Sequence, residues 1–273
     1  MDDFKDKVAV ITGGATGIGF GLAKRFGALG AKIVIGEPRQ NRLDEALASL
    51  TELGIEAAAM VLDVGKPESM EAFADFVWET HGGAHVLINN AGIAIGRAPL
   101  PDVDLDDMRR LFDVNLFGVW HGAASFGKRM IAQGEPAAIY NVASENAFFN
   151  AVQNSAAYIT SKHAVRGLTE AMRDDFPDFI QVGMIVPGFV ASEMTKGSEQ
   201  LAMDADTFAE KVVTQIAAGE FYVVTHAYNI ERIKPIHDEI EGAYARNAPR
   251  YDGDDEYDVP TLIARLSAGR DGS

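Results

Sequence analysis

The sequence of 273 residues contains no cysteine. The protein can therefore form no disulfide, no cysteine-ligated metal centre and no thiol nucleophile, and nothing favours an oxidising compartment. Basic residues are scarce as well, because 24 Lys and Arg stand against 40 Asp and Glu, for a formal charge of −16. Nucleic acids and anionic membranes select basic surfaces, so we expect neither of them as a partner.

Long apolar runs are also missing. No segment approaches the roughly 18 uncharged apolar residues that a membrane-spanning helix requires. The N-terminal segment MDDFKDKVAVITGG begins with acidic residues and reaches glycine after a short apolar run, which is not the pattern of a secretory signal. We therefore expect a cytoplasmic protein. Its composition is ordinary for a globular chain and no linker-like stretch divides it, so we expect one domain over residues 1–273.

Short apolar runs alternate with longer segments of helical periodicity. Most of these runs are apolar at nearly every position, as in strands that are buried on both faces of a parallel sheet. The pattern predicts an α/β fold, namely a single-domain Rossmann-type doubly wound parallel sheet of about seven strands with helices on both faces. The predicted strands are 8–12, 32–36, 56–63, 85–89, 137–143, 180–186 and 221–225.

The alternation stops after Pro187. Residues 191–204 contain no strand-like run and predict a substrate loop or lid. Residues 226–273 predict a C-terminal extension with an amphipathic helix from Asn229 to about Arg246, an acidic stretch and a short last helix. The acidic stretch YDGDDEYD lacks a defined ligand loop, so we interpret it as a solvated surface segment. The histidines show no ligand spacing either, and we predict no metal.

A glycine-rich segment, TGGATGIG at residues 12–19, connects the first predicted strand to the first helix. Glycines allow a backbone to turn tightly and to approach a pyrophosphate, whose charge then meets the amide groups at a helix N-terminus. The position between strand and helix indicates a dinucleotide site. Asp63 and Asn90 lie at the ends of the third and fourth strands, where ligands bind in open α/β sheets.

Glu37 ends the second strand and bears on the choice of cofactor. A carboxylate there can accept hydrogen bonds from the adenosine ribose hydroxyls and repels a 2′-phosphate, which favours NAD over NADP. Arg39 would instead favour NADP, because an arginine two positions later could bind a 2′-phosphate if the loop bends. The alternative for Arg39 is a solvated Glu-Pro-Arg turn.

Tyr158 and Lys162 form a candidate reactive pair. On a helix, residues four apart share one face, so the phenol and the ammonium can point into one site. A phenol has a pKa near 10, and we expect the ammonium and a positive nicotinamide to lower the pKa of Tyr158. Ser144 ends the fifth strand, where its hydroxyl could hold a substrate oxygen. Asn115, in DVNLFGVW, could anchor a water in a proton relay.

With these motifs in order, the sequence resembles the classical short-chain dehydrogenase/reductase family between Lys5 and Met194. The resemblance is carried by TGGATGIG, LDV, NNAG, the VN of DVNLFG, the serine strand, YITSK and VPGFV. It implies a catalytic tetrad of Asn115, Ser144, Tyr158 and Lys162. In this tetrad Tyr158 would be the general acid/base and Ser144 would polarise the substrate oxygen. Lys162 would bind the nicotinamide ribose and lower the pKa of Tyr158, with Asn115 supporting the proton relay.

The family motifs and the glycine loop together imply the cofactor contacts. These are Gly13, Thr16, Gly17, Ile18, Gly19, Glu37, Asp63, Val64, Asn90, Tyr158, Lys162, Pro187, Val190 and Ser192. Ser192 stands where the family commonly has a threonine that meets the nicotinamide carboxamide. Glu145 and Asn146 depart from the small or apolar residues that usually follow the serine, and we expect Glu145 to turn outward.

The C-terminal part lacks the usual family ending. Its FYVVTH segment resembles a subset whose members act on bulky secondary alcohols, among them aryl-ether alcohols derived from lignin. We expect NAD-dependent hydride transfer between a bulky aromatic or alicyclic secondary alcohol and its ketone. Two alternatives are an NADPH-dependent carbonyl reductase and a non-catalytic dinucleotide-binding module. The family usually forms oligomers, so we expect a homodimer or homotetramer. The expected substrate pocket consists of Ile95, Phe148, Phe149, Phe189 and Met194.

Overall fold

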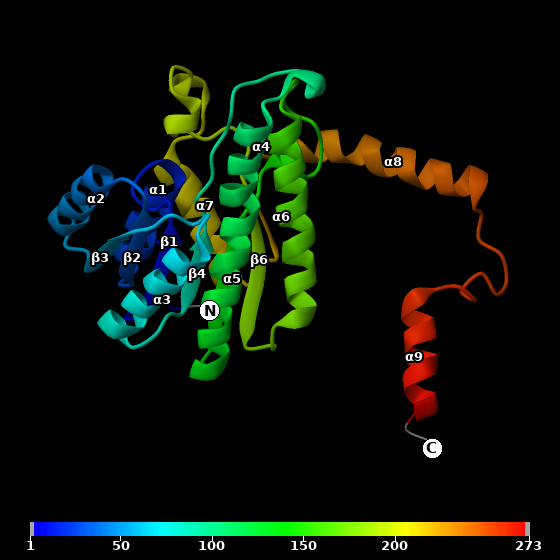
Figure 1. Cartoon of the computed structure of the whole chain (residues 1–273), viewed down its shortest axis with the longest axis horizontal. Coiled ribbons are helices and arrows are strands. Elements are labelled where there is room, and N and C mark those ends of the chain that lie inside the picture. Colours follow the sequence, from blue (N-terminus) through cyan, green and yellow to red (C-terminus); the bar gives the residue numbers. More distant parts are fainter. Residues whose placement is uncertain (1–2, 271–273) are drawn as a thin grey trace. The chain divides into compact units, whose positions relative to one another are not determined.

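The computed structural model describes residues 3–270. They divide into two compact units, one that ends at Asn229 and one that begins at Ile230. The first unit contains a parallel sheet of seven strands in the order β3-β2-β1-β4-β5-β6-β7, with helices on both faces (Figure 1). The predicted Rossmann-type fold is therefore confirmed.

The predicted strand boundaries agree with the structure to within two residues. The strands are β1 (Val8–Thr12), β2 (Lys32–Glu37), β3 (Ala57–Val61), β4 (Val86–Asn89), β5 (Ala137–Val142), β6 (Ile180–Val186) and β7 (Tyr222–Val224). The helices of the first unit are α1 (Gly17–Ala28), α2 (Gln40–Glu52), α3 (Pro67–His81), α4 (Leu105–Phe112), α5 (Gly118–Gln133), α6 (Ala156–Asp175) and α7 (Ala205–Ala217).

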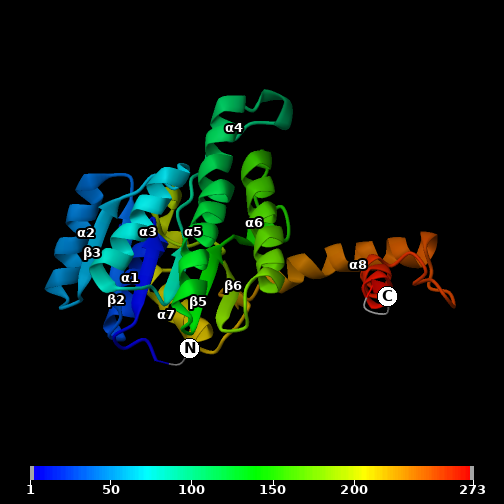
Figure 2. The same cartoon turned by 60° about the horizontal axis from the view of Figure 1, so that its bottom comes forward.

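The five inner strands are almost entirely buried because two helical layers cover the sheet (Figure 2), whereas the edge strands β3 and β7 are partly exposed. Successive side chains of a strand point to opposite faces. Ala9 and Ile11 of β1 accordingly pack in one core with residues of α1, α2 and α7. Val8 and Val10 pack in a second core with residues of α3 and α5. This double burial explains why the strands lack the alternation of a sheet with one solvated face.

The strand order reverses between β1 and β4. From β1 the chain builds outward to β2 and β3, and it then crosses back so that β4 pairs with the other edge of β1. The segments that leave β1 and β4 therefore diverge to opposite sides of the sheet. In open α/β sheets, the crevice outside the carboxyl ends at this reversal is where ligands bind.

A π-helix over Asp113–Phe117 joins α4 to α5, and Asn115 lies fully buried in it. The sequence indicates only a helix here. The wider turn is not a property of the local pattern, because it accompanies the side-chain contacts of Asn115 with another loop. Such turns occur as local bulges within helices, frequently at functional sites.

Residues 191–204 form no strand, as predicted, but the loop has internal order. Short 3-10 turns lie at Glu193–Thr195 and Glu199–Leu201. Its base is held by backbone hydrogen bonds from Ala191 N to Met203 O and from Met203 N to Phe189 O, each 2.9 Å. The loop therefore leaves and rejoins the body at one place, which suits a lid; that role stays a prediction.

The second unit consists of most of α8 (Asn229–Asn247), the acidic stretch and α9 (Val259–Arg270). Both helices lie where the sequence predicts them. In the acidic stretch, the carboxylate of Asp254 pairs with the guanidinium of Arg250. Across residues 3–270, none of the helices combines the length and apolar character that spanning a membrane would need.

Candidate active site

A cavity of about 410 Å³ lies at the carboxyl ends of the central strands. This volume falls in the range of small-molecule and cofactor sites. The residues that line it include every predicted cofactor contact, namely Gly13, Thr16, Gly17, Ile18, Gly19, Glu37, Asp63, Val64, Asn90, Tyr158, Lys162, Pro187, Val190 and Ser192. The topology thus brings together residues that are up to 179 positions apart between Gly13 and Ser192.

The glycine loop needs glycine for two separate physical reasons. Gly17 has φ +53, which side-chain-bearing residues rarely adopt. A Cβ on Gly19 would lie 2.2 Å from the carbonyl oxygen of Gly13 and 2.5 Å from Nδ2 of Asn90. The loop therefore closes only without side chains at these positions, which leaves its backbone open to the cavity.

The N-terminus of α1 is free to receive an anion. The capping residue Thr16 makes no side-chain hydrogen bond there, and the first turn contains no acidic residue. The first amide groups of a helix have no partner within the helix and carry partial positive charge. Together with the open glycine backbone and the Glu37 carboxylate in the same cavity lining, this arrangement fits the pyrophosphate and ribose of a dinucleotide.

Asn90 ties the ends of β1 and β4 together. Its Nδ2 donates to the carbonyl oxygens of Thr12 at 2.9 Å and Gly13 at 3.0 Å. The Thr12 hydroxyl oxygen accepts from the backbone amides of Asn90 and Ala91, each at 3.0 Å. The NNAG motif is therefore more than a polar turn, because it fixes the glycine loop against the fourth strand.

Lys162 is buried beneath Tyr158 on α6. Its Nζ donates a hydrogen bond of 2.9 Å to the carbonyl oxygen of Val142 and lies 5.7 Å from the centroid of the Tyr158 ring. Burial lowers the pKa of Lys162 to about 8, because an apolar environment penalises the ammonium. The two side chains share one helix face, as the spacing of four residues predicts.

The pKa of Tyr158 differs from the expectation. Burial raises it, and the nearby charge of Glu145 raises it further, while a hydrogen bond with Ser144 lowers it. The expected lowering is therefore wrong for the protein by itself, since desolvation of the phenolate is the largest influence. The Lys162 ammonium is engaged by a backbone carbonyl rather than by the phenol oxygen.

Asn115 lies next to the cavity rather than in its lining. Its Oδ1 accepts from the amide of Ile93 at 2.8 Å, and its Nδ2 donates to the carbonyl oxygen of Ile93 at 3.0 Å and to the Ser161 hydroxyl at 3.3 Å. The side chain thereby connects the loop after β4 to α6. These contacts of Asn115 hold the surrounding backbone in place. Its role in a proton relay through water stays a prediction.

Asn146 is a site residue that motif reasoning noted only as a departure. Its backbone amide and its Nδ2 donate to the Ser144 hydroxyl oxygen at 3.2 and 3.3 Å, and its Oδ1 accepts from Ala151 N at 3.1 Å. Because the Ser144 oxygen accepts both of these bonds, its own proton is available to donate into the cavity. Asn146 therefore orients the serine.

Glu145 turns away from the cavity lining, as expected. Its carboxylate accepts a hydrogen bond of 2.8 Å from the Tyr228 hydroxyl. Tyr228 follows His226, whose Nδ1 accepts from the amide of Gly188 at 3.1 Å. The last residue of the FYVVTH segment, His226, thus holds the loop after β6 through the amide of Gly188.

The predicted substrate residues are divided between two locations. Met194 lines the cavity, whereas Ile95, Phe148, Phe149 and Phe189 do not. The Phe148 ring packs at 6.1 Å from the Tyr222 ring and lies 4.5 Å from the Arg166 guanidinium. Ile93, at the start of the predicted pocket segment 93–97, and Val114 line the cavity as well. Contact of the four other residues with a substrate stays a prediction.

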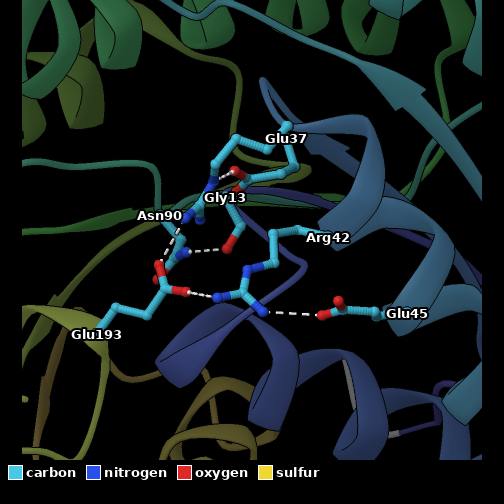
Figure 3. A network of polar contacts seen from close by, with 7 residues as sticks. Gly13, Glu37, Arg42, Glu45, Asn90 and Glu193 are labelled. Carbon is cyan, nitrogen blue, oxygen red and sulfur yellow. Dashed lines mark hydrogen bonds and ion pairs between the residues drawn. The ribbon is translucent and has the colours of Figure 1, made fainter.

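Charged side chains surround the end of the cavity near Glu37 (Figure 3). The buried Glu37 carboxylate accepts from Nε of Arg39 at 2.5 Å. Arg39 Nη1 also donates to Glu193 Oε2 at 2.8 Å, and Arg42 Nη2 lies 2.8 Å from Glu193 Oε1. Arg39 is exposed, as in the solvated turn of the alternative interpretation, but its guanidinium also pairs with two carboxylates. Glu193 was not singled out from the sequence, which offers no signal for a contact across 154 positions.

Comparison with known proteins decides the family. A family model described as short chain dehydrogenase matches residues 7–202, which is more than half of the chain. The chain belongs to the short-chain dehydrogenase family. The resemblance inferred from the motifs is thereby confirmed, and this short-chain dehydrogenase is an oxidoreductase.

Several relatives have more specific names. The C alpha-dehydrogenase of Sphingobium sp. strain SYK-6 is 37% identical over 199 residues, which cover 72% of this chain and 65%, just under two thirds, of that protein. The 1-deoxy-11-beta-hydroxypentalenate dehydrogenase of Streptomyces avermitilis is 32% identical over 229 residues, with 80% and 84% of the two chains covered. The cyclohexanol dehydrogenase of Acinetobacter sp. strain SE19 is 30% identical over 201 residues, with 73% and 79% covered.

Among solved structures, the dehydrogenase is similar to a short chain dehydrogenase/reductase from Burkholderia phymatum in complex with NAD. The TM-score is 0.84 at 27% identity, and the match covers 92% of this chain and 99% of the other.

Proposed function

We propose that this oxidoreductase uses a nicotinamide dinucleotide, with a preference for NAD, to interconvert a bulky secondary alcohol and its ketone. One observation carries the proposal. The Tyr158 and Ser144 side chains, the Lys162 side chain and the Glu37 carboxylate all line a single cavity with the glycine loop. A binding module without catalysis would need no proton-transferring group in that cavity.

The residues of the chain have distinct tasks in this proposal. When bound, the cofactor supplies a nicotinamide carbon that exchanges a hydride with the substrate. In alcohol oxidation Tyr158 takes the hydroxyl proton, and in ketone reduction it returns one. The Ser144 proton, directed by Asn146, holds the substrate oxygen. The Lys162 ammonium, which the carbonyl oxygen of Val142 holds in place, binds the ribose, and Asn115 holds the backbone that frames the site.

The preference for NAD rests on the buried Glu37 carboxylate at the end of β2. A 2′-phosphate near this group would meet a negative charge that has no room to move away. Arg39 could neutralise such a phosphate, but its guanidinium already bonds two carboxylates. The similar Burkholderia phymatum structure holds NAD, which supports the same choice.

Apolar residues of the cavity and the names of the relatives support the proposed substrate class. Ile93, Val114 and Met194 supply apolar surface to the cavity. The names of the relatives refer to cyclohexanol and to a hydroxypentalenate as substrates. An alicyclic or aromatic secondary alcohol agrees with both, because apolar surface binds such rings by the hydrophobic effect.

A screen of cyclic and aryl secondary alcohols with NAD and with NADP, followed by NADH or NADPH absorbance, tests the proposal. We expect Tyr158→Phe to lose turnover by about 10²–10⁴-fold while cofactor binding is kept. Tyr222→Phe removes the same atom from a tyrosine outside the cavity, whose hydroxyl bonds Glu170, and serves as the matched control. Full turnover by Tyr158→Phe, or cofactor binding with no turnover on any alcohol or ketone, would refute the catalytic role.

A further inference from the structure

One carboxylate of the loop, that of Glu193, pairs with two guanidinium groups, of which that of Arg39 belongs to the cavity lining. Glu193 Oε2 accepts from Arg39 at 2.8 Å, and Glu193 Oε1 lies 2.8 Å from Arg42 Nη2 (Figure 3). Each oxygen thus binds a different arginine. Arg42 turns its other nitrogen, Nη1, toward Glu45 on α2 at 2.8 Å.

The position of Glu193 gives this arrangement a consequence for the cofactor. Glu193, Arg39 and Glu37 all line the same end of the cavity, whereas Arg42 and Glu45 do not. A 2′-phosphate carries about two negative charges and binds best to paired guanidinium groups. The two arginines would offer such a pair. The Glu193 carboxylate, which is negatively charged and binds one arginine with each oxygen, already occupies the position that a phosphate would take between them.

We propose that Glu193 is a second cofactor-specificity residue, which excludes NADP by occupying Arg39 and Arg42 from the loop side. The proposal rests on the preference for NAD inferred above. Glu37 acts by direct repulsion at the strand end, and Glu193 acts by removing the cations that could offset that repulsion. Two carboxylates and two guanidiniums leave this region with no net positive charge for a 2′-phosphate.

Removing the Glu193 carboxylate should change that balance. Arg39 would keep its bond to Glu37, but its Nη1 would be free, and Arg42 would lose its partner on the cavity side. The region would gain one positive charge beside the adenosine ribose. NAD has no charged group there and should be affected little, whereas NADP should bind more tightly.

The test compares Glu193→Gln with Glu45→Gln. Glu45 pairs with the same Arg42 but lies outside the cavity lining, so its variant loses the same charge without freeing Arg39. Both side chains are well exposed, so both variants should fold. Fluorescence titrations of NADH and NADPH give dissociation constants without turnover. Competition by 5′-AMP and by adenosine 2′,5′-bisphosphate isolates the 2′-phosphate.

We expect Glu193→Gln to tighten NADPH binding by about tenfold or more and to change NADH binding by less than about threefold. Glu45→Gln should leave the ratio of the two within about threefold of the wild type. An unchanged ratio in Glu193→Gln, an equal shift in both variants, or an equal loss of both cofactors would overturn the role of Glu193. A wild type that prefers NADPH would instead overturn the proposed NAD preference itself, which distinguishes the two failures.

Discussion

The buried ammonium of Lys162 should lower the free energy of unfolding of the cofactor-free protein. Its side chain is 4% exposed, and burial lowers its pKa from 10.5 to about 8. Such a decrease corresponds to about 3.4 kcal/mol, at about 1.4 kcal/mol per pH unit. Below pH 8 the folded protein bears this cost in full, because the lysine is charged in both the folded and the unfolded states.

Replacement by methionine should therefore stabilise the protein. Lys162→Met removes the buried charge and keeps the length of the side chain, but it loses the hydrogen bond to the carbonyl oxygen of Val142. That loss costs about 1–1.5 kcal/mol, which leaves a gain of about 2 kcal/mol at pH 7. For a chain of this size, we expect the melting temperature to rise by about 4 °C while turnover is lost.

The pH dependence provides a second readout with a definite sign. Between pH 8 and 10.5 the folded lysine loses its proton before the unfolded one, so the unfolded state binds more protons and the stability of the wild type rises with pH. The gap between Lys162→Met and wild type should shrink from about 2 kcal/mol at pH 7 to near zero at pH 9.5. Urea unfolding at the two pH values measures the gap, and other titrating groups cancel in the difference.

Lys128→Met is the matched control, because Lys128 is an exposed lysine on α5. Its stability should remain within about 0.5 kcal/mol of the wild type at both pH values. The reasoning fails if Lys162→Met is less stable than the wild type at pH 7. It also fails if the gap is the same at pH 9.5, since the gain would then come from packing rather than from charge.

Three other predictions concern the loop, the acid/base group and assembly. Gly19→Ala should abolish measurable NADH binding, because its Cβ would lie 2.2 Å from the Gly13 carbonyl oxygen. Gly167→Ala is the control, since its Cβ would lie in open space, and this variant should bind NADH normally and have a slightly higher melting temperature. Because the pKa of Tyr158 is raised, kcat/KM for alcohol oxidation should increase with pH into the alkaline range and that for ketone reduction should decrease; a flat pair of profiles would contradict Tyr158 as the proton carrier. We also propose a homodimer or homotetramer that buries the exposed face of α5, where Trp120 is 55% exposed in the single chain. Trp120→Glu should therefore lower the mass measured by light scattering. An unchanged mass would exclude this face of α5 as the subunit interface.

The fold and the cofactor cavity could be predicted because their signals are local. Strands buried on both faces are continuous apolar runs, and a glycine loop between strand and helix has a fixed spacing. Three residues of the predicted tetrad that are separated in the sequence, Ser144, Tyr158 and Lys162, line one cavity. The topology guarantees this meeting once the strand order is known, because the ends of parallel strands share one edge of the sheet.

The parts that could not be predicted depend on contacts between distant segments. The π-turn at Asn115 accompanies bonds to the backbone of Ile93, which is 22 positions away. Aromatic residues in the loop after Ser144 could line a pocket or pack in the core, and Phe148 packs beside Tyr222. The pKa of Tyr158 could not be read from its helical partner alone, because desolvation of the phenolate is the largest influence and the charge of Glu145 acts in the same direction.

The site combines a fixed part with a part that can vary. Tyr158, Lys162 and Ser144 lie on α6 and at the end of β5, and buried hydrogen bonds hold their surroundings. Met194 and Glu193 instead lie in one 3-10 turn of a loop, and two backbone hydrogen bonds hold the base of this loop. Both side chains are exposed, so we expect substitutions in that turn to leave the core packing intact. The proposed substrate range and cofactor choice could then change there while the residues proposed to transfer the proton stay in place. Because the two residues are adjacent, a substitution of Met194 that alters the proposed substrate contact also affects the turn that positions Glu193.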